Sequence, residues 1–238
     1  MIELLSDPQT WIAFLTLTAL ELVLGIDNVI FISILVDKLA KERRDFARRI
    51  GLFLAMFMRI GLLLVLSWIV GLTEPLFTVL RQDFSGRDLI LIAGGLFLLW
   101  KSTKEIHQLL EGAAGEASTA VRATFAAVIA QIIIIDLVFS FDSVITAVGM
   151  VDQVGIMIAA VIVSVLLMMA FSGVIARVVS AHPTIKMLAL AFLLVIGVVL
   201  IADGFGQHVS KGYIYFAMAF SLFVELLNLR YHKKRRAA

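Results

Sequence analysis

Long apolar segments separated by short polar ones run through the whole chain. Seven of them approach the roughly 20 residues that a helix needs to cross the hydrocarbon core of a bilayer. They lie near residues 11–36, 47–71, 88–103, 123–150, 154–176, 184–203 and 211–229. The pattern predicts an all-α polytopic membrane protein with seven transmembrane helices in a single transmembrane domain, residues 1–238.

The composition points to the same class of protein. The chain is 61% hydrophobic and 16% charged, whereas soluble domains are about half apolar and about a quarter charged. It contains no cysteine, which excludes disulfides, thiolate metal ligands and thiol chemistry. The net charge of +2 says little, because the placement of the charges carries the information. We expect the lipid bilayer as the main partner and no nucleic acid.

The basic residues predict an orientation. Sixteen of the twenty lysines and arginines fall on one predicted side of the membrane, in residues 38–49, 101–122, 177–186 and the tail 230–238. Arg81, Arg87 and Lys211 fall on the other side. Because cytoplasmic loops are enriched in Lys and Arg, we predict a multi-pass protein of the bacterial inner membrane, with its N-terminus outside and its C-terminus in the cytoplasm.

An acidic motif occurs twice. The chain reads ELVLGIDNVI from residue 21 and DLVFSFDSVI from residue 136, a constant offset of 115. The offset pairs Glu21 with Asp136, Asp27 with Asp142 and Asn28 with Ser143. Each copy would belong to a repeat of three helices, and an odd number forces the second repeat to enter the membrane from the opposite side.

The repeat therefore predicts two inverted three-helix repeats plus one extra helix, an arrangement typical of secondary transporters. The first repeat spans about 11–103 and the second about 123–203. Between them, residues 104–122 are interpreted as a linker with a short helix at its start. The seventh helix, 211–229, and the basic tail, 230–238, lie outside the repeats.

Four carboxylates in the two motif helices need a physical reason, since a charge at the bilayer centre costs at least about 2.5 kcal/mol. We interpret the motif residues as a cation site: Glu21, Asp27, Asn28, Asp136, Asp142 and Ser143. Carboxylate, amide and hydroxyl oxygens suit Mn²⁺, Mg²⁺ or Ca²⁺, and the methionines of the helices are interpreted as packing residues. The alternative is that the acids are protonated or paired with Arg59 and bind nothing.

The predicted depths bring Glu21 and Asp136 together near the membrane centre, with Asp27 and Asp142 offset to either side. Acids six residues apart point about 120° away from each other on an ideal helix. They would converge if the helix unwound between them, and Gly25, or less strongly Ser140, is the expected break.

Three further polar residues lie in the apolar segments. Arg59 is the expected counter-charge for the acids, either mobile during transport or fixed in a salt bridge. Glu225 and Asn228 share a face of the seventh helix. They form either a cytoplasmic vestibule or a cap at the helix end.

The sequence resembles the TerC family of membrane proteins over essentially its whole length. The resemblance rests on ELVLGIDNVIF, DLVFSFDSVITAVGM, GGLFLLWKSTKEIH and FSLFVELLNLR. The chain's length and short basic tail are similar to stand-alone, YgdQ-type members without an appended domain. The resemblance implies a seven-helix fold related to the LysE-type transporters and a role in metal homeostasis, chiefly manganese efflux. It also implies that the six motif residues named above line the ion site.

We therefore predict a membrane transporter, not an enzyme, that exports a divalent cation, with Mn²⁺ as the first candidate. The metal is the substrate, and no permanently bound cofactor is expected. Carboxylates that share a site resist ionising together, so protons compete with the metal and are the expected exchange partner.

Three alternatives stay open from the sequence. An exporter of a small organic cation or amino acid would have only Arg59 to hold a substrate carboxylate. An intramembrane aspartyl protease using Asp27 and Asp142 is disfavoured, because its usual signatures are missing. A membrane factor in metal homeostasis that does not transport is the third.

Overall fold

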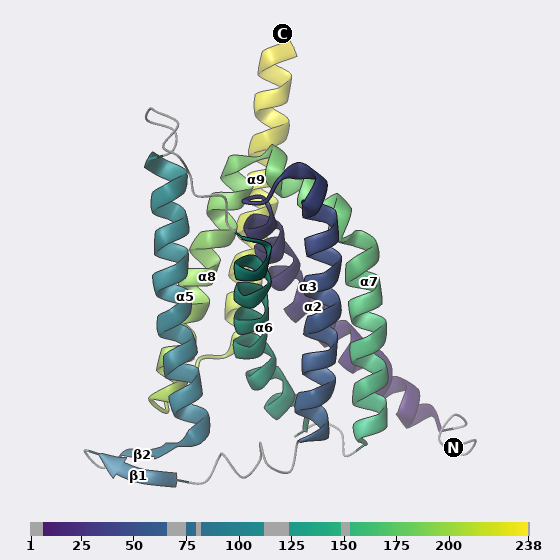
Figure 1. Ribbon diagram of the computed structural model, residues 1–238, viewed down its shortest axis with the longest axis vertical. Coiled ribbons are helices and arrows are strands. Elements are labelled where there is room, and N and C mark those ends of the chain that lie inside the picture. The colour runs from purple at the N-terminus through teal and green to yellow at the C-terminus, as the bar shows by residue number, and fades with distance from the viewer. Residues whose placement is uncertain (1–6, 66–74, 80–81, 112–123, 149–152, 238) are drawn as a thin grey trace.

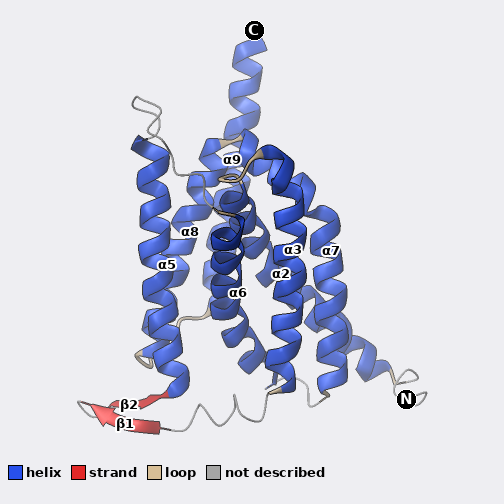
Figure 2. Ribbon diagram, viewed as in Figure 1, coloured by secondary structure: helices blue, strands red, loops and turns tan. Residues whose placement is uncertain are grey.

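The computed structural model describes residues 7–65, 75–79, 82–111, 124–148 and 153–237 (Figure 1). These residues form seven helices and one two-stranded hairpin (Figure 2). The elements are α2 (Pro8–Val36), α3 (Lys41–Leu64), β1 (Pro75–Val79), β2 (Gln82–Ser85), α5 (Gly86–Glu111), α6 (Phe125–Val148), α7 (Val154–Ala181), α8 (Pro183–Gly204) and α9 (Lys211–Ala237).

A helix occupies each of the seven predicted segments, and the fold is that of a helical membrane protein. Four of the described helices are long and apolar enough to cross a membrane: α2, α7, α8 and the part of α9 from Gly212 to Tyr231. A shorter apolar helix, Phe125–Phe141, lies within α6.

Several helices extend beyond the apolar segments that predicted them. α3 begins at Lys41 rather than at 47. α5 continues to Glu111, so the short helix expected at the start of the linker is the last part of α5, residues 104–111. α9 includes most of the basic tail. The reason is that Lys, Arg and Glu are good helix formers, so a helix need not end where its apolar residues end.

The hairpin β1–β2 was not predicted from the sequence. Its strands pair antiparallel, with Phe77 opposite Phe84, and the two rings stack with centroids 5.7 Å apart. Aromatic and β-branched residues favour strands, and such cross-strand pairs stabilise them. The two strand segments are short and lie between two long apolar segments that predict helices, so the pattern of residues did not reveal them.

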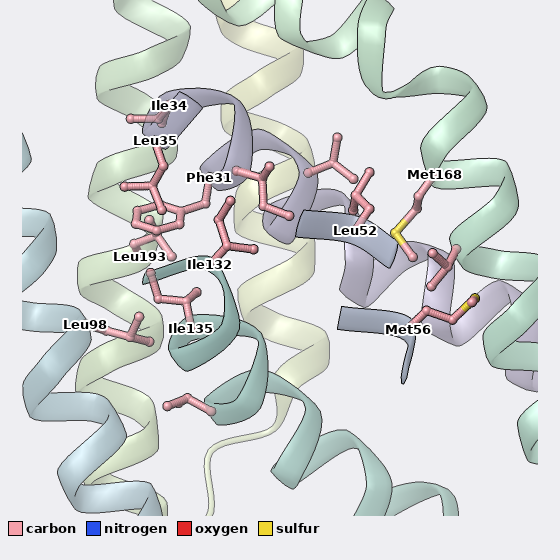
Figure 3. Packing of buried hydrophobic residues seen from close by; sticks show 14 of the residues in the cluster. Phe31, Ile34, Leu35, Leu52, Met56, Leu98, Ile132, Ile135, Met168 and Leu193 are labelled. Atoms are coloured by element: carbon pink, nitrogen blue, oxygen red, sulfur yellow. The ribbon is translucent and has the colours of Figure 1, made fainter. Parts of the chain in front are cut away.

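The helices pack mainly across the two halves of the chain. α2 packs most extensively against α7, α6 against α3, and α5 against α8. The last pair approaches closely at Gly95 and Gly197, where a Cβ on Gly95 would lie 2.5 Å from the Gly197 carbonyl oxygen. Small residues allow such backbone contact between membrane helices. Figure 3 shows the buried apolar side chains that fill the space between the helices.

α2 passes from the surface of the bundle into its core. Near its start Trp11 and Leu15 are exposed, whereas every residue from Phe31 to Val36 is buried. Its first half can therefore face lipid, while its second half is enclosed by protein. This path carries Glu21 and Asn28 into the interior, where both are buried.

Candidate functional site

A buried arginine joins three helices at the centre of the site. Arg59 on α3 is 3% exposed. Its Nη1 donates to Oε2 of Glu21 on α2. Its Nη2 and Nε donate to Oδ1 and Oδ2 of Asp136 on α6, at 2.7 and 3.4 Å. The equivalent acids of the two motifs, far apart in the sequence, therefore bind one guanidinium.

Asp136 accepts further hydrogen bonds. The Nδ2 of Asn28 donates to Oδ1 at 2.9 Å, and the Oγ of Ser140 donates to Oδ2 at 3.1 Å. Buried polar groups are normally paired in this way. With both acids ionised the cluster carries one net negative charge, so the arginine neutralises the site only in part.

A small cavity of about 10 Å³ borders Glu21 and Arg59, about the space that one water molecule needs. Besides these two residues it is lined by apolar side chains: Leu17, Leu63, Val144, Met157, Ala160 and Val161. The carboxylate of Glu21 thus borders a void beside α7, whereas Asp136 is enclosed by donors.

The structure brings four of the predicted site residues together: Glu21, Asn28, Arg59 and Asp136. Three others, Asp27, Asp142 and Ser143, lie on α2 and α6, but their side chains are outside the described part of the chain. Among the described His, Asp and Glu side chains, no group of three or more could hold a metal ion.

The two residues of the expected vestibule lie elsewhere, on α9. Glu225 is half-buried and Asn228 is exposed. α9 packs mainly against α8. Neither residue takes part in the hydrogen bonds around Arg59 among the described contacts.

The expected helix breaks are wrong. α2 is continuous from Pro8 to Val36 through Gly25, and α6 from Phe125 to Val148 through Ser140. Gly25 instead makes room for a neighbour, because a Cβ there would lie 2.3 Å from the Sδ of Met168. Ser140 uses its hydroxyl to bind Asp136. Unwound carbonyls are therefore not available as ligands at these two positions.

Sequence reasoning missed the contribution of α7 to the site. Ser164 is fully buried there and donates to the Val161 carbonyl at 2.9 Å, and Met157 lines the cavity beside Glu21. Which residues α7 places beside α2 depends on the register between the two helices, and no motif in the sequence encodes that register.

Ion pairs hold the end of α2 to its neighbours. The carboxylate of Asp37 accepts from Arg44 at 3.2 Å, from Ser180 at 3.0 Å and from Lys186 at 3.4 Å. Since these partners lie on α3, α7 and α8, one acid ties α2 to three helices.

The next residue ties α2 to α5. Lys38 donates to Glu105, and Lys101 donates to the same carboxylate at 2.8 Å. Burial would raise the pKa of Glu105, but the hydrogen bonds from Lys101 and Lys38 outweigh it and hold the pKa below its usual range. Burial lowers the pKa of Lys38, an effect that the bond to Glu105 offsets only in part.

A larger cavity, of about 200 Å³, lies away from the acids, between α2, α8 and α9. Its lining is apolar apart from Tyr215, and it includes Val23, Ile30, Leu193 and Met218. With no charged side chain in its wall, it suits a lipid chain rather than an ion. It therefore does not define the site.

The fold and the buried charges define an integral membrane protein whose polar centre is enclosed by helices. The sequence model that describes the integral membrane protein TerC family matches residues 6–237 of this chain. The chain belongs to this family.

Curated relatives cover nearly the whole chain. It is 52% identical over 230 residues to the inner membrane protein YgdQ of Escherichia coli K12, covering 97% of both. It is 50% identical over 231 residues to a Haemophilus influenzae protein, covering 97% of this chain and 98% of the relative. The inner membrane protein YoaE of Escherichia coli K12 is 51% identical over 227 residues, which are 95% of this chain and 44% of YoaE. No solved structure matches the chain.

Proposed function

We propose that this protein is a transporter of the bacterial inner membrane that exports a divalent metal cation, with Mn²⁺ as the first candidate, in exchange for protons. One observation carries the proposal: the equivalent acids of the two motifs, Glu21 and Asp136, bind the same buried Arg59. Ionisable residues inside a membrane protein are costly and usually mark an ion pathway.

The packing supports the inverted-repeat architecture that such transporters share. In a repeat, α2, α3 and α5 would correspond to α6, α7 and α8. Exchanging the two repeats would convert the α2–α7 contact into the α6–α3 contact and would convert the α5–α8 contact into itself. These three contacts are the most extensive ones between helices. The close contact between Gly95 and Gly197 would then lie near the symmetry axis.

Arg59 supplies a physical means of exchange. In the described conformation the guanidinium takes the place that a cation would occupy between Glu21 and Asp136. A divalent cation and the arginine together would carry three positive charges against the two carboxylates. Entry of the cation would therefore favour displacement of Arg59 and release of any proton held by the acids, which couples metal movement to protons.

The names of the relatives and the basic residues support the location and orientation. YgdQ and YoaE are named inner membrane proteins. The basic segments of the α2–α3 and α7–α8 turns meet at one end of the bundle, where Asp37 contacts Arg44 and Lys186. The C-terminus projects from the same end in Figure 1. By the positive-inside rule this end is cytoplasmic.

The test is Mn²⁺ flux into proteoliposomes, measured with a trapped metal-sensitive dye under imposed pH gradients. Wild type is compared with Glu21→Gln plus Asp136→Asn and with Asp27→Asn plus Asp142→Asn. The control is Glu42→Gln plus Glu111→Gln, since both residues are exposed acids of the same bundle. We expect flux that follows the proton gradient in wild type and in the control, and its loss in both site variants.

Two results would contradict the proposal. Folded wild-type protein without metal flux under any gradient would favour the non-transporting factor in metal homeostasis. In a binding assay, competition by lysine but not by Mn²⁺ would favour an exporter of organic cations or amino acids.

A further inference from the structure

α7 runs alongside α2 in a fixed register that places one of its methionines at the site. Gly25 contacts Met168 and Asp37 bonds to Ser180, and both pairs are separated by 143 positions. The equal separation means that the two helices run parallel. The same register sets Ser164 of α7 level with Glu21.

Met168 directs its sulfur at the polar face of α2. Its side chain is 5% exposed and extends from α7 toward the centre of the bundle in Figure 3. The Sδ lies in the space beside Gly25 that a side chain would otherwise fill. Because Glu21, Gly25 and Asn28 are spaced by four and three residues, they share one face of the helix. The sulfur therefore lies between the levels of the carboxylate and the amide.

Asn28 has an acceptor without a partner at this place. Its Nδ2 donates to Asp136, but its Oδ1 is buried and has no hydrogen-bond partner among the described residues. Leaving a buried acceptor unsatisfied is unfavourable. A cation held between Asn28 and the acids would satisfy it.

We propose that Met168 is a specificity-determining residue whose thioether joins the oxygen ligands of the site and favours transition-metal cations over Mg²⁺ and Ca²⁺. The inference rests on the proposed function. Mg²⁺ and Ca²⁺ take oxygen ligands, so a thioether adds nothing to their binding. It is polarisable and adds to the binding of softer divalent ions such as Fe²⁺, Co²⁺ or Cd²⁺, and to a lesser degree of Mn²⁺.

If Met168 only fills space between the helices, replacing it with leucine should leave the cation preference unchanged; if its sulfur is a ligand, the preference should change. Leu and Met exchange with little change in volume, so Met168→Leu keeps the contact with Gly25 and removes only the sulfur. Met169→Leu is the matched control, because Met169 is the neighbouring methionine and is only half-buried.

The experiment measures flux of Mn²⁺ and Cd²⁺ in proteoliposomes, together with competition by Mg²⁺ and Ca²⁺. We expect Met168→Leu to lower the preference for Cd²⁺ over Mg²⁺ by about tenfold, the lower end of what a lost metal-site interaction costs. Met169→Leu should behave as wild type. Wild-type flux with the same cation preference in Met168→Leu overturns this inference and leaves the proposed function intact. The absence of any wild-type flux overturns both.

A second variant keeps the inference testable if Met168→Leu does not fold. The chain has no cysteine, so Met168→Cys introduces a single thiol and retains a soft sulfur at the site. We expect its preference for Cd²⁺ over Mg²⁺ to equal or exceed that of wild type. A preference at least tenfold below wild type in folded Met168→Cys would overturn the inference.

Discussion

Arg59 binds Asp136 side-on, with Nη2 at 2.7 Å from Oδ1 and Nε at 3.4 Å from Oδ2, across 77 positions of sequence. Two parallel N–H bonds of this kind fix geometry as well as charge. The pair joins α3 to α6, one helix from each half of the chain. The third nitrogen of the guanidinium remains for Glu21, so one side chain sets the relative positions of three helices.

Replacing Arg59 should strongly destabilise the protein. Arg59→Gln leaves two buried carboxylates without their cation, and breaking a buried ion pair in this way costs about 3–5 kcal/mol. Arg59→Lys should cost less, since it keeps the charge but loses the side-on pair. The measurement is unfolding in detergent micelles.

Arg49→Gln is the control for this series, because Arg49 is exposed on the same helix. Adding Asp136→Asn to Arg59→Gln should restore part of the loss. If Arg59→Gln unfolded at the same point as Arg49→Gln, the ion pairs would not hold the helices together.

The close contact of α5 and α8 predicts contrasting effects at two glycines. Gly95→Ala places a Cβ 2.5 Å from the Gly197 carbonyl oxygen. The helices must separate, and overpacking of this kind costs about 1–3 kcal/mol. Gly61→Ala meets no atom within 4 Å and should be neutral or stabilising by up to about 1 kcal/mol. Thermal unfolding of the two variants in one detergent checks the contrast; equal effects would refute the contact.

The ion pairs at Glu105 predict a loss of stability in acid. The folded-state pKa of Glu105 lies below its ordinary value of 4.5. The unfolded chain therefore takes up the proton first as the pH falls. The contribution of Glu105 is present above pH 4.5 and disappears as the pH falls through the lowered folded-state pKa.

Comparing the unfolding of wild type and Glu105→Gln across this range measures the contribution. Wild type should be the more stable above pH 4.5, and the difference should shrink below it. Glu111→Gln, an exposed site on the same helix, should follow wild type throughout. A difference that stayed constant with pH would show that Glu105 acts through packing rather than through its charge.

The orientation is testable with reporters. A fluorescent protein fused after Ala238 should fold in the cytoplasm and fluoresce, and alkaline phosphatase at the same position should be inactive. Both reporters should give the opposite result when inserted between α8 and α9, at residues 205–210. The physical reason is the concentration of Lys and Arg on one side of the membrane. An active phosphatase at the C-terminus would invert the proposed topology.

The order of apolar and polar residues along the chain was sufficient to predict the class of protein and to identify the main buried polar residues. Apolar segments near bilayer length predicted seven helices, and a helix lies in each segment. The repeated motif singled out Glu21 and Asp136, which share Arg59 in the structure. These features are local or periodic, so they can be read without knowing which helices touch.

The packing partners could not be found in this way. The contact of Met168 with Gly25, the bond from Ser140 to Asp136 and the ion pairs of Asp37 depend on the register and rotation of helices distant in sequence. The unbroken course of α2 through Gly25 has the same origin, since a packed side chain occupies the space at which a break was expected. Registers of this kind arise from the fit of many side chains at once, and no single segment carries the information.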